Sequence, residues 1–562
     1  MFSSLNRQDV KTKTQNEHLD LIVIGGGITG AGITLDAVNR GMKVAQLEMQ
    51  DFAAGTSSRS TKLIHGGLRY LKQFEFGVVA ETGKERAIVY ENGPHVTTPE
   101  WMMLPFYKGG TFGPTMTNIG LRVYDFLAGV KKSERRKMFK PEEALTREPL
   151  LNAKDLKGAG YYVEYKTDDA RLTIEVIKRA VEKGALSLNY MKVTNLVYEN
   201  NKVIGVEVED QLDGSTQQYF AKKIVNAAGP WVDTLREIDH SKKGKHLRLT
   251  KGIHLVFDGG RFPLKQAIYF DTPDGRMAFA IPREGKTYVG TTDNVYTGEI
   301  ANPKITVADR DYVLNAIDYM FPEVNIKPED VESSWAGLRP LIHEEGKDPS
   351  EISRKDEIFV SDSGFISIAG GKLTGYRKMA ESIVDLVGKQ LETEENLKFP
   401  HVQTKELHIS GGNVGGAAGF KDYINQKVAV GIEQGLKEDT AKKLAERYGS
   451  NIEIIFDIYQ REKSTAEAEN IDPVVLAVLR YAIDYELAYK PVDFFIRRTG
   501  ALFFNIAWIH EHESDVINYM SKLFGWSNVQ KQVYTEELEQ ALYNAVHPVK
   551  KDKKSMSETM VS

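Results

Sequence analysis

The feature that most constrains this chain is a glycine loop between a buried strand and a helix. Residues 19–24 form a short apolar run, and Gly25, Gly27 and Gly30 follow with the spacing G-x-G-x-x-G. Glycines let the backbone turn tightly and approach a pyrophosphate, and the helix that follows offers unpaired N–H groups. The pattern therefore predicts a buried parallel strand, a phosphate-binding turn and a helix.

A second strand completes the unit. Residues 30–40 have helical spacing and stop before Gly41, and residues 43–48 are predicted as a strand that ends at Glu48. An acid at this position accepts hydrogen bonds from ribose hydroxyls. Together these elements favour a dinucleotide site over a tight turn that binds nothing, but they do not separate FAD from NAD.

The segment after Glu48 favours FAD. Residues 51–68 are dense in hydroxyls and small side chains, which can line a pyrophosphate and a flavin ring. Two later strands, within 223–230 and 365–372, also run into glycines. The candidate contacts in the first of these segments are Thr56, Ser57, Lys62 and Leu63.

Length and composition limit the remaining possibilities. At 562 residues the chain exceeds the roughly 250–300 residues of one core, so two or three domains are expected. The absence of cysteine excludes disulfides and thiolate metal sites, and no His or carboxylate spacing suggests a metal. A net charge of −5 argues against nucleic-acid binding. Residues 1–17 are polar without a signal-peptide pattern, and no apolar run is long enough to span a bilayer.

The middle and the end of the chain differ in pattern. Residues 251–292 alternate in polarity with turns such as Asp274-Gly275, which predicts an antiparallel sheet that caps the cofactor domain. Beyond about residue 400 the spacing becomes helical, so we expect a separate helical domain.

Several motifs, in order along the chain, resemble those of the FAD-dependent glycerol-3-phosphate dehydrogenases of the bacterial, aerobic type. They cover roughly residues 18–385, and residues 493–499 resemble the C-terminal domain of the same family. One departure is Ala228, where many flavoproteins have threonine. The motifs are Thr56-Ser57-Ser58, Lys62 to Leu71, Thr167 to Leu172, Val225 to Val232, Val289 to Asp293, Ala336 to Leu341 and Gly370 to Arg377. The resemblance implies further FAD contacts within them, at Gly229, Trp231, Gly371, Leu373 and Thr374.

The resemblance implies an α/β fold with a Rossmann-like FAD domain of the D-amino-acid oxidase and glutathione reductase kind, a substrate-binding cap and a helical C-terminal domain. The expected bounds are 18–95, 150–240 and 335–390 for the FAD domain, 96–149 and 241–334 for the cap, 400–547 for the helical domain, and 1–17 and 548–562 for flexible termini.

The resemblance also implies the reaction. sn-Glycerol 3-phosphate is oxidised at C2 to dihydroxyacetone phosphate, hydride passes to flavin N5, and electrons leave to a membrane quinone. The enzyme is then peripheral on the cytoplasmic face of the membrane, and whether it forms a homodimer stays open. Basic clusters at 131–140 and 550–554 are candidate membrane contacts, with solvated loops as the simpler interpretation.

The substrate phosphate requires cations in a dry site. Arg69, Arg339 and Lys372 are the candidates, and Tyr70 can add a hydroxyl. Removal of the C2 hydroxyl proton requires a base with a pKa near the working pH, which points to histidine.

His65 is the first choice for this base because its motif neighbours should face the flavin. Arg339 and His254 are the alternatives at the reacting centre.

Three other functions stay open. A glycerol-3-phosphate oxidase uses oxygen and makes hydrogen peroxide, but that branch typically carries an insertion ahead of its C-terminal part, which this chain lacks. An amine or amino-acid oxidase needs a carboxylate clamp and no dianion site. A non-catalytic flavin-binding protein would keep the motifs without turnover.

Overall fold

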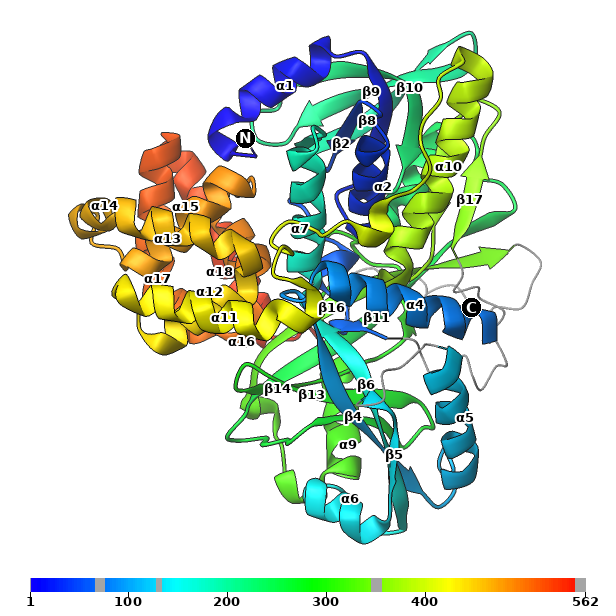
Figure 1. The fold of residues 1–562 in the computed structure, drawn as a ribbon, viewed down its shortest axis with the longest axis vertical. Helices are drawn as coiled ribbons and strands as arrows, with labels where there is room; N and C mark the ends of the chain where they lie inside the picture. Colours follow the sequence, from blue (N-terminus) through cyan, green and yellow to red (C-terminus); the bar gives the residue numbers. More distant parts are fainter. Residues whose placement is uncertain (1, 66–75, 128–133, 345–355, 551–562) are drawn as a thin grey trace.

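The computed structural model describes residues 2–65, 76–127, 134–344 and 356–550, which form two sheets and a helical C-terminal unit (Figure 1). The first sheet has the order β17-β18-β10-β1-β2-β7, with β8 and β9 attached through β10. Its strands are β1 (Leu19–Ile24), β2 (Val44–Leu47), β7 (Leu186–Leu188), β8 (Met191–Glu199), β9 (Lys202–Asp210), β10 (Thr216–Asn226), β17 (Glu357–Val360) and β18 (Ile366–Ala369).

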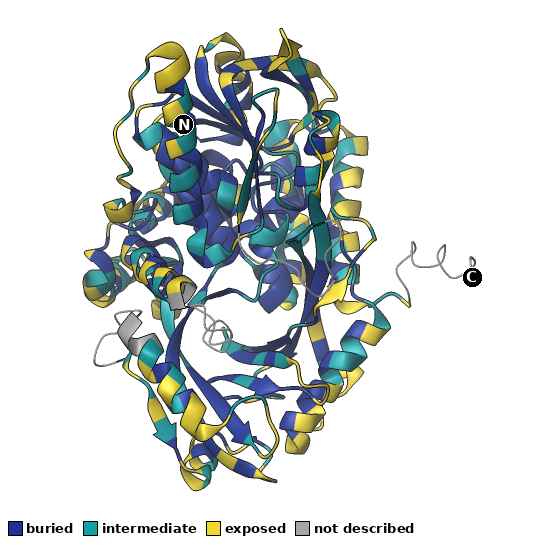
Figure 2. Cartoon of the chain, turned by 90° about the vertical axis from the view of Figure 1, so that its right-hand side faces the viewer, coloured by how far each residue is buried: buried dark blue, intermediate teal, exposed yellow. Residues whose placement is uncertain are grey.

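The centre of this sheet is parallel and completely covered. β1 lies between β10 and β2, and all six of its residues are buried. Helices α2 (Ile28–Asn39) and α10 (Tyr376–Glu395) cover one face, and β8 and β9 cover the other. Residues on alternating sides of β1 accordingly belong to two different cores. The central strands of this sheet are buried and dark blue in Figure 2, whereas the helices carry exposed, yellow residues on their outer faces.

The second sheet carries the platform that the sequence predicts. Its order is β15-β11-β14-β13-β12-β4-β6-β3, with β16 paired to β11 and β5 to β6. Helix α9 (Val307–Met320) packs on one face, and the other face contacts the segment after β2. The strands are β3 (Leu63–Ile64), β4 (Thr97–Tyr107), β5 (Lys137–Phe139), β6 (Leu156–Thr167), β11 (Lys245–Asp258), β12 (Ala267–Asp271), β13 (Met277–Arg283), β14 (Lys286–Gly290), β15 (Asn294–Val295) and β16 (Val331–Glu344).

Four more helices connect these strands. Helix α7 packs beside α2, and α4 and α5 flank the second sheet. The helices are α4 (Phe76–Asn92), α5 (Pro114–Leu127), α6 (Pro141–Arg147) and α7 (Asp169–Glu182), with the short α8 (Val232–Ile238) after β10.

The expectation of a helical C-terminal domain is confirmed. Its core is continuous with buried residues of the second sheet, among them Tyr288 and Trp335. The helices are α11 (Gly416–Glu433), α12 (Glu438–Tyr448), α13 (Ile452–Arg461), α14 (Lys463–Ala468), α15 (Pro473–Tyr485), a π-helical turn (Asp493–Arg498), α16 (Ala501–Phe504), α17 (Ile506–Phe524) and α18 (Asn528–Val546).

Strand pairing moves two of the expected domain boundaries. β6 pairs with β4 along its length, so the chain leaves the second sheet only at Asp168, which caps α7, and not at residue 150. β16 likewise belongs to the second sheet from Val331 onward. Apolar alternation predicts a strand but does not say which sheet the strand joins, and for this reason the sequence-based boundaries were wrong here.

The expectation of a flexible N-terminus is also wrong for the described residues. Ser4–Asn6 and α1 (Arg7–Asn16) are helical, and Arg7 and Lys11 form ion pairs with buried Asp210 at 3.1 and 2.7 Å. The polar residues that suggested a solvated tail find partners inside the protein. At the other end, Val549 pairs with the backbone around Ile305, and residues 551–562 lie outside the described residues.

The described residues contain no helix that is long and apolar enough to cross a membrane. In the same part of the chain, no group of three His, Asp or Glu side chains is arranged to hold a metal ion.

Acid sensitivity of the fold should depend on His95, between α4 and β4. Burial, and then the charges of Lys178 and Arg171, lower the pKa of His95 to about 3. Below about pH 6.5 the unfolded chain therefore binds a proton at this histidine, whereas the folded protein does not. This lowers the free energy of unfolding by about 1.4 kcal/mol per pH unit. Stability from this group is complete above pH 6.5 and is lost as the pH falls towards 3.

We expect the melting temperature to fall less in His95→Gln than in the wild type when the pH is lowered from 8 to 5. Exposed His401→Gln serves as the control and should behave like the wild type. Equal losses in all three proteins, measured by differential scanning calorimetry, would contradict this role of His95.

Candidate functional site

The glycine loop lies at the carboxyl end of β1 and folds closely on itself. Gly25 has a φ of +117°, and a Cβ there would lie 2.5 Å from the carbonyl oxygen of Ala227. A Cβ on Gly30, in the first turn of α2, would overlap the carbonyl oxygen of Gly25. Side chains at these positions would open the turn, so both glycines are required by geometry.

Glu48 lies directly beside this loop. Its carboxylate accepts hydrogen bonds from Gly26 N at 2.6 Å and from Gln50 N at 2.8 Å. Burial raises the pKa of Glu48, and the two backbone hydrogen bonds oppose that rise. The acid therefore stands at the end of β2 with its orientation fixed by the glycine loop, where it can meet a ribose.

The hydroxyl-rich segment connects the glycine loop to the second sheet. Ser57 Oγ accepts from Ile28 N at 2.9 Å, at the start of α2, and lies 3.1 Å from where a Cβ on Gly27 would be. Thr56 Oγ1 donates to Leu338 O in β16 at 2.7 Å. The two hydroxyls thus tie the phosphate-binding turn to the platform.

Lys62 turns its side chain away from the solvent. Its Nζ pairs with Asp169 Oδ1 at 2.6 Å and donates to Ser58 O at 2.9 Å, and the residue is buried. Its φ of +58° marks a sharp turn before Leu63, which opens β3. The charge of Lys62 is used inside the protein, and its backbone is also paired: Lys62 N donates to Ser60 Oγ at 2.9 Å, and Lys62 O accepts from Thr167 N at 2.8 Å.

The second and third glycine segments lie at the same edge of the sheet. β10 and β18 run parallel to β1, so the loops after them meet the glycine loop. Gly229 has a φ of +54°, and the ring of Trp231 lies 3.5 Å from where a Cβ on Gly55 would be. These three loops surround one edge of the sheet, as the sequence predicts for a dinucleotide site.

The segment after β18 approaches His65. Gly371 has a φ of +80°, and Lys372 precedes the short helical turn Leu373–Gly375 that leads into α10. Thr374 Oγ1 donates to His65 O at 3.3 Å. The imidazole of His65 lies edge-on to Phe279 of β13, with ring centroids 5.9 Å apart. The structure therefore brings His65, Thr374 and the second sheet together.

Arg339 projects from β16 towards the end of β14. Its guanidinium donates to Thr291 Oγ1 at 2.9 Å and to Thr292 O at 3.1 Å, and lies 3.3 Å from Asp293. Gly252 on neighbouring β11 leaves space for it, since a Cβ there would overlap the guanidinium. About 28% of the side chain remains exposed, so the cation is held but accessible.

His254 is buried behind this arginine. Its Nε2 shares a hydrogen bond with Thr61 Oγ1 at 3.1 Å, and its ring stacks on Trp335 at 4.7 Å. Burial, and then the charges of Arg339 and Lys62, hold the pKa of His254 well below its usual range. The ring is therefore neutral at the pH of most enzyme reactions.

Two predicted substrate residues, Arg69 and Tyr70, lie outside the described residues. Conversely, the sequence-based selection passed over Arg59, which follows the hydroxyl-rich helical turn. It donates to Ala301 O at 3.1 Å, and burial lowers its pKa to about 10. The sequence signal that could have found it is a cation inside a segment of hydroxyls and small side chains.

These features define a class. A parallel sheet with a glycine loop, an acid after the second strand and an antiparallel platform above the loops is the arrangement of a dinucleotide-dependent oxidoreductase of the flavoprotein kind. The residues fit FAD, because side chains are excluded at Gly25 and Gly30, and Glu48 and Ser57 flank the turn.

Comparison with known proteins identifies the family. Residues 20–377 match the FAD dependent oxidoreductase family, and residues 402–531 match the C-terminal domain of alpha-glycerophosphate oxidase. The chain is 63% identical over 548 residues to aerobic glycerol-3-phosphate dehydrogenase of Bacillus subtilis, covering 98% of this chain and 99% of the relative. It is 58% identical to the protein of that name from Staphylococcus epidermidis, over 97% and 98%. The chain therefore belongs to the family of aerobic glycerol-3-phosphate dehydrogenases.

Comparison with solved structures supports the same family and fold. The glycerol-3-phosphate dehydrogenase from Bacillus halodurans, solved in complex with FAD, is 49% identical and superposes with a TM-score of 0.86 over 98% of this chain and 99% of that one. L-alpha-glycerophosphate oxidase from Mycoplasma pneumoniae shares the fold, with 19% identity and a TM-score of 0.53 over 69% of this chain and 97% of that one.

The close packing of the glycine loop can be tested with Gly30→Ala. The added Cβ meets the carbonyl oxygen of Gly25, so the turn must open and FAD should bind at least about 100-fold more weakly, since about 2.7 kcal/mol suffices. The measurement is the flavin absorbance that stays with the protein on gel filtration. Gly77→Ala in α4, with no atom within 4 Å of the new Cβ, should retain its FAD.

Proposed function

We propose that this chain oxidises sn-glycerol 3-phosphate at C2 to dihydroxyacetone phosphate, with FAD as the bound cofactor and a membrane quinone as the final acceptor. The observation that carries the proposal is similarity over almost the whole chain to aerobic glycerol-3-phosphate dehydrogenases, including the segments that carry Arg339 and Lys372. The site supplies the groups that this reaction requires.

The substrate phosphate is bound by cations on different elements. Arg339 is partly exposed and is oriented by Thr291, and Lys372 stands at the start of a helical turn, where a cation is unfavourable unless an anion is near. Arg69 and Tyr70 complete the proposed phosphate site. An arginine fork and a lysine point charge together suit a phosphate dianion.

The C2 hydroxyl proton goes to His65. The main chain of His65 is fastened to Thr374, and its ring is edge-on to Phe279, which supports an orientation towards the space between the two sheets. His254 is less suited to accept the proton, because burial and Arg339 oppose its positive charge. We assign His254 to substrate contact and Arg339 to stabilising the developing charge on the C2 oxygen.

Bound FAD supplies flavin N5 as the acceptor for the hydride that leaves C2. The glycine loop and Glu48 bind its adenosine diphosphate half, and the segment around Leu373 lies where backbone N–H groups can meet its ring.

Quinone as the acceptor implies contact with a membrane from the cytoplasmic side. Helix α5 supports such a contact, because Met116 and Ile119 are exposed on it. The basic segment that contains Arg136 lies against the same helix, through a bond of 3.1 Å to Asn118. Lys131 and Lys132 of this cluster lie outside the described residues.

The first test is anaerobic reduction of the purified holoenzyme. Glycerol 3-phosphate should bleach the oxidised flavin absorbance within seconds, and a simple amino acid should not. Absence of bleaching would overturn the proposal in favour of a non-catalytic flavin protein, and bleaching by an amino acid alone would favour an amino-acid oxidase.

The final acceptor is tested in air. Turnover with a quinone analogue should greatly exceed hydrogen peroxide formation. Peroxide at a comparable rate would favour a glycerol-3-phosphate oxidase. That alternative is consistent with the match of residues 402–531 to the C-terminal domain of alpha-glycerophosphate oxidase.

Three substitutions separate the residue roles. Lys372→Met should raise KM about 10-fold or more with less effect on kcat, because one charge-assisted contact is worth about 1.5–3 kcal/mol. His65→Ala should slow flavin reduction by about 100-fold or more and remove the acid-side limb of its pH dependence, because a base must be unprotonated to accept the proton. His254→Gln should keep that limb, since His254 is neutral throughout. An unchanged reduction rate in His65→Ala, measured by stopped flow, would exclude His65 as the base.

A further inference from the structure

The loop that follows Glu48 holds the glycine loop in shape. Ala53 N donates to Gly26 O at 3.0 Å, and a Cβ on Gly26 would lie 2.6 Å from the ring of Phe52 and 2.7 Å from Cβ of Glu48. Gly26 N in turn binds the Glu48 carboxylate. Any shift of residues 51–54 would therefore move both the phosphate-binding turn and the ribose-binding acid.

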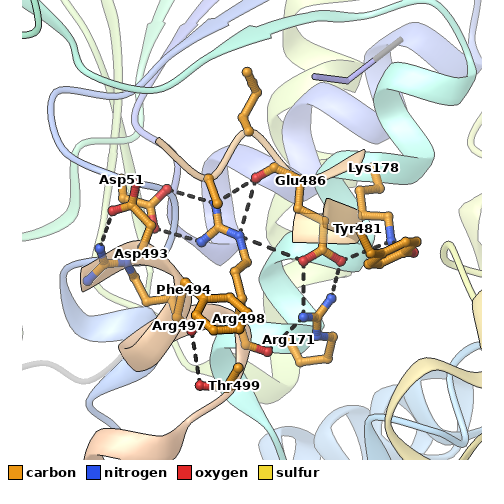
Figure 3. Close-up of polar contacts among 12 residues, drawn as sticks. Asp51, Arg171, Lys178, Tyr481, Glu486, Asp493, Phe494, Arg497, Arg498 and Thr499 are labelled. Carbon is orange, nitrogen blue, oxygen red and sulfur yellow. Dashed lines mark hydrogen bonds and ion pairs between the residues drawn. The ribbon is translucent and has the colours of Figure 1, made fainter. Parts of the chain in front are cut away.

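Asp51, in this loop, is fastened to the C-terminal domain. Arg498 binds both of its carboxylate oxygens, through Nη1 at 2.7 Å and Nη2 at 2.9 Å, and Arg497 Nε donates to the same group (Figure 3). Asp51 and Arg498 are each only 1% exposed. A buried, bidentate ion pair thus connects a loop of the cofactor domain to residues almost 450 positions later in the chain.

Further charges fix the two arginines. Arg498 also donates to Glu486 O, and Glu486 pairs with Arg171 on α7 of the cofactor domain (Figure 3). Arg497 Nη2 binds Asp493 Oδ1 at 2.6 Å. The guanidinium groups therefore have little freedom to follow Asp51 if that loop moves.

Asp51 and the two arginines carry opposite charges, and this changes the pKa of Asp51. Burial alone would raise the pKa of Asp51, but Arg498 and Arg497 outweigh it and hold that pKa well below its usual value. Burial, and then the charge of Asp51, raise the pKa of Asp493. Asp51 therefore stays charged and depends on its two arginines, since a buried charge without a partner is strongly unfavourable.

We propose that Arg497 and Arg498 are positioning residues for the cofactor: through Asp51, the helical C-terminal domain sets the geometry of the loop that follows Glu48 and supports Gly26, and so sets the affinity for FAD. This deepens the proposed function, since it rests on FAD as the cofactor. It gives the C-terminal domain a role in cofactor binding without any contact between Arg498 and the dinucleotide.

The proposal predicts coupled effects on FAD affinity. Arg498→Met keeps the length of the side chain, removes the fork and leaves Asp51 buried without its main partner. We expect at least a tenfold increase in the dissociation constant of FAD, measured by titrating the apoprotein and following flavin fluorescence. Asp51→Asn should weaken FAD similarly, and the double variant should be no weaker than the worse single variant, because both changes break one interaction.

Two further variants separate positioning from general damage. Arg498→Lys keeps the charge without the fork and should recover part of the lost affinity. Arg480→Met is the matched control, because Arg480 forms its ion pair with Asp484 at 2.9 Å inside α15 and is likewise a largely buried arginine of the helical domain. It should lower the melting temperature and change the FAD dissociation constant less than twofold.

A measurement on the unaltered protein covers the case in which Arg498→Met does not fold. Coupling between two sites is reciprocal, so FAD binding should slow hydrogen exchange of backbone amides in residues 486–499. The proposal is overturned if FAD leaves that exchange unchanged, or if Arg498→Met and Arg480→Met bind FAD equally well. If the wild-type apoprotein does not bind FAD, the assignment of FAD as the cofactor is contradicted instead. If the substrate does not bleach the flavin, the proposed reaction is contradicted, but the FAD affinities of the variants can still be compared.

Discussion

The steric fit of the glycine loop is the constraint on which the rest of the site depends. Gly25 and Gly30 touch through the backbone, and Gly26 lies between Glu48 and Phe52 with no space for a methyl group. Close approach of backbone to backbone fixes the turn, and with it the N-terminus of α2, at the edge of the sheet. Because Glu48 is hydrogen-bonded to Gly26, the acid and the phosphate-binding turn cannot be placed independently.

Charge is distributed differently in the two halves of the site. Near the glycine loop, the ammonium of Lys62 is used by Asp169 and the carboxylate of Asp51 by the arginines of the C-terminal domain. On the platform, Arg339 keeps part of its surface open and His254 is kept neutral. The internal pairs hold backbone in place, whereas the partly open cation is suited to an incoming anion.

Sequence reasoning succeeded where local pattern and chemistry coincide. The strand, turn and helix around Gly25 and the acid at Glu48 follow from residue type and spacing, and the structure has them side by side. It failed where partners are remote in the chain. The residues near Lys62 do not indicate that it pairs with Asp169, and the polar N-terminal segment does not indicate that it pairs with Asp210. Long-range pairing also decides sheet membership, which is why β6 was assigned to the wrong domain.

The same limit explains why the role of the C-terminal domain could not be predicted from its residues. Arg497 and Arg498 alone indicate a solvated helix end or a phosphate contact, and only their pairing with Asp51 suggests otherwise. Displacing one partner of a buried ion pair is strongly unfavourable, because it leaves an uncompensated buried charge. The pairs with Asp51 therefore oppose movement of the loop after β2. In the proposal, the C-terminal domain therefore supports the cofactor site from outside, although its sequence lies far from every dinucleotide motif.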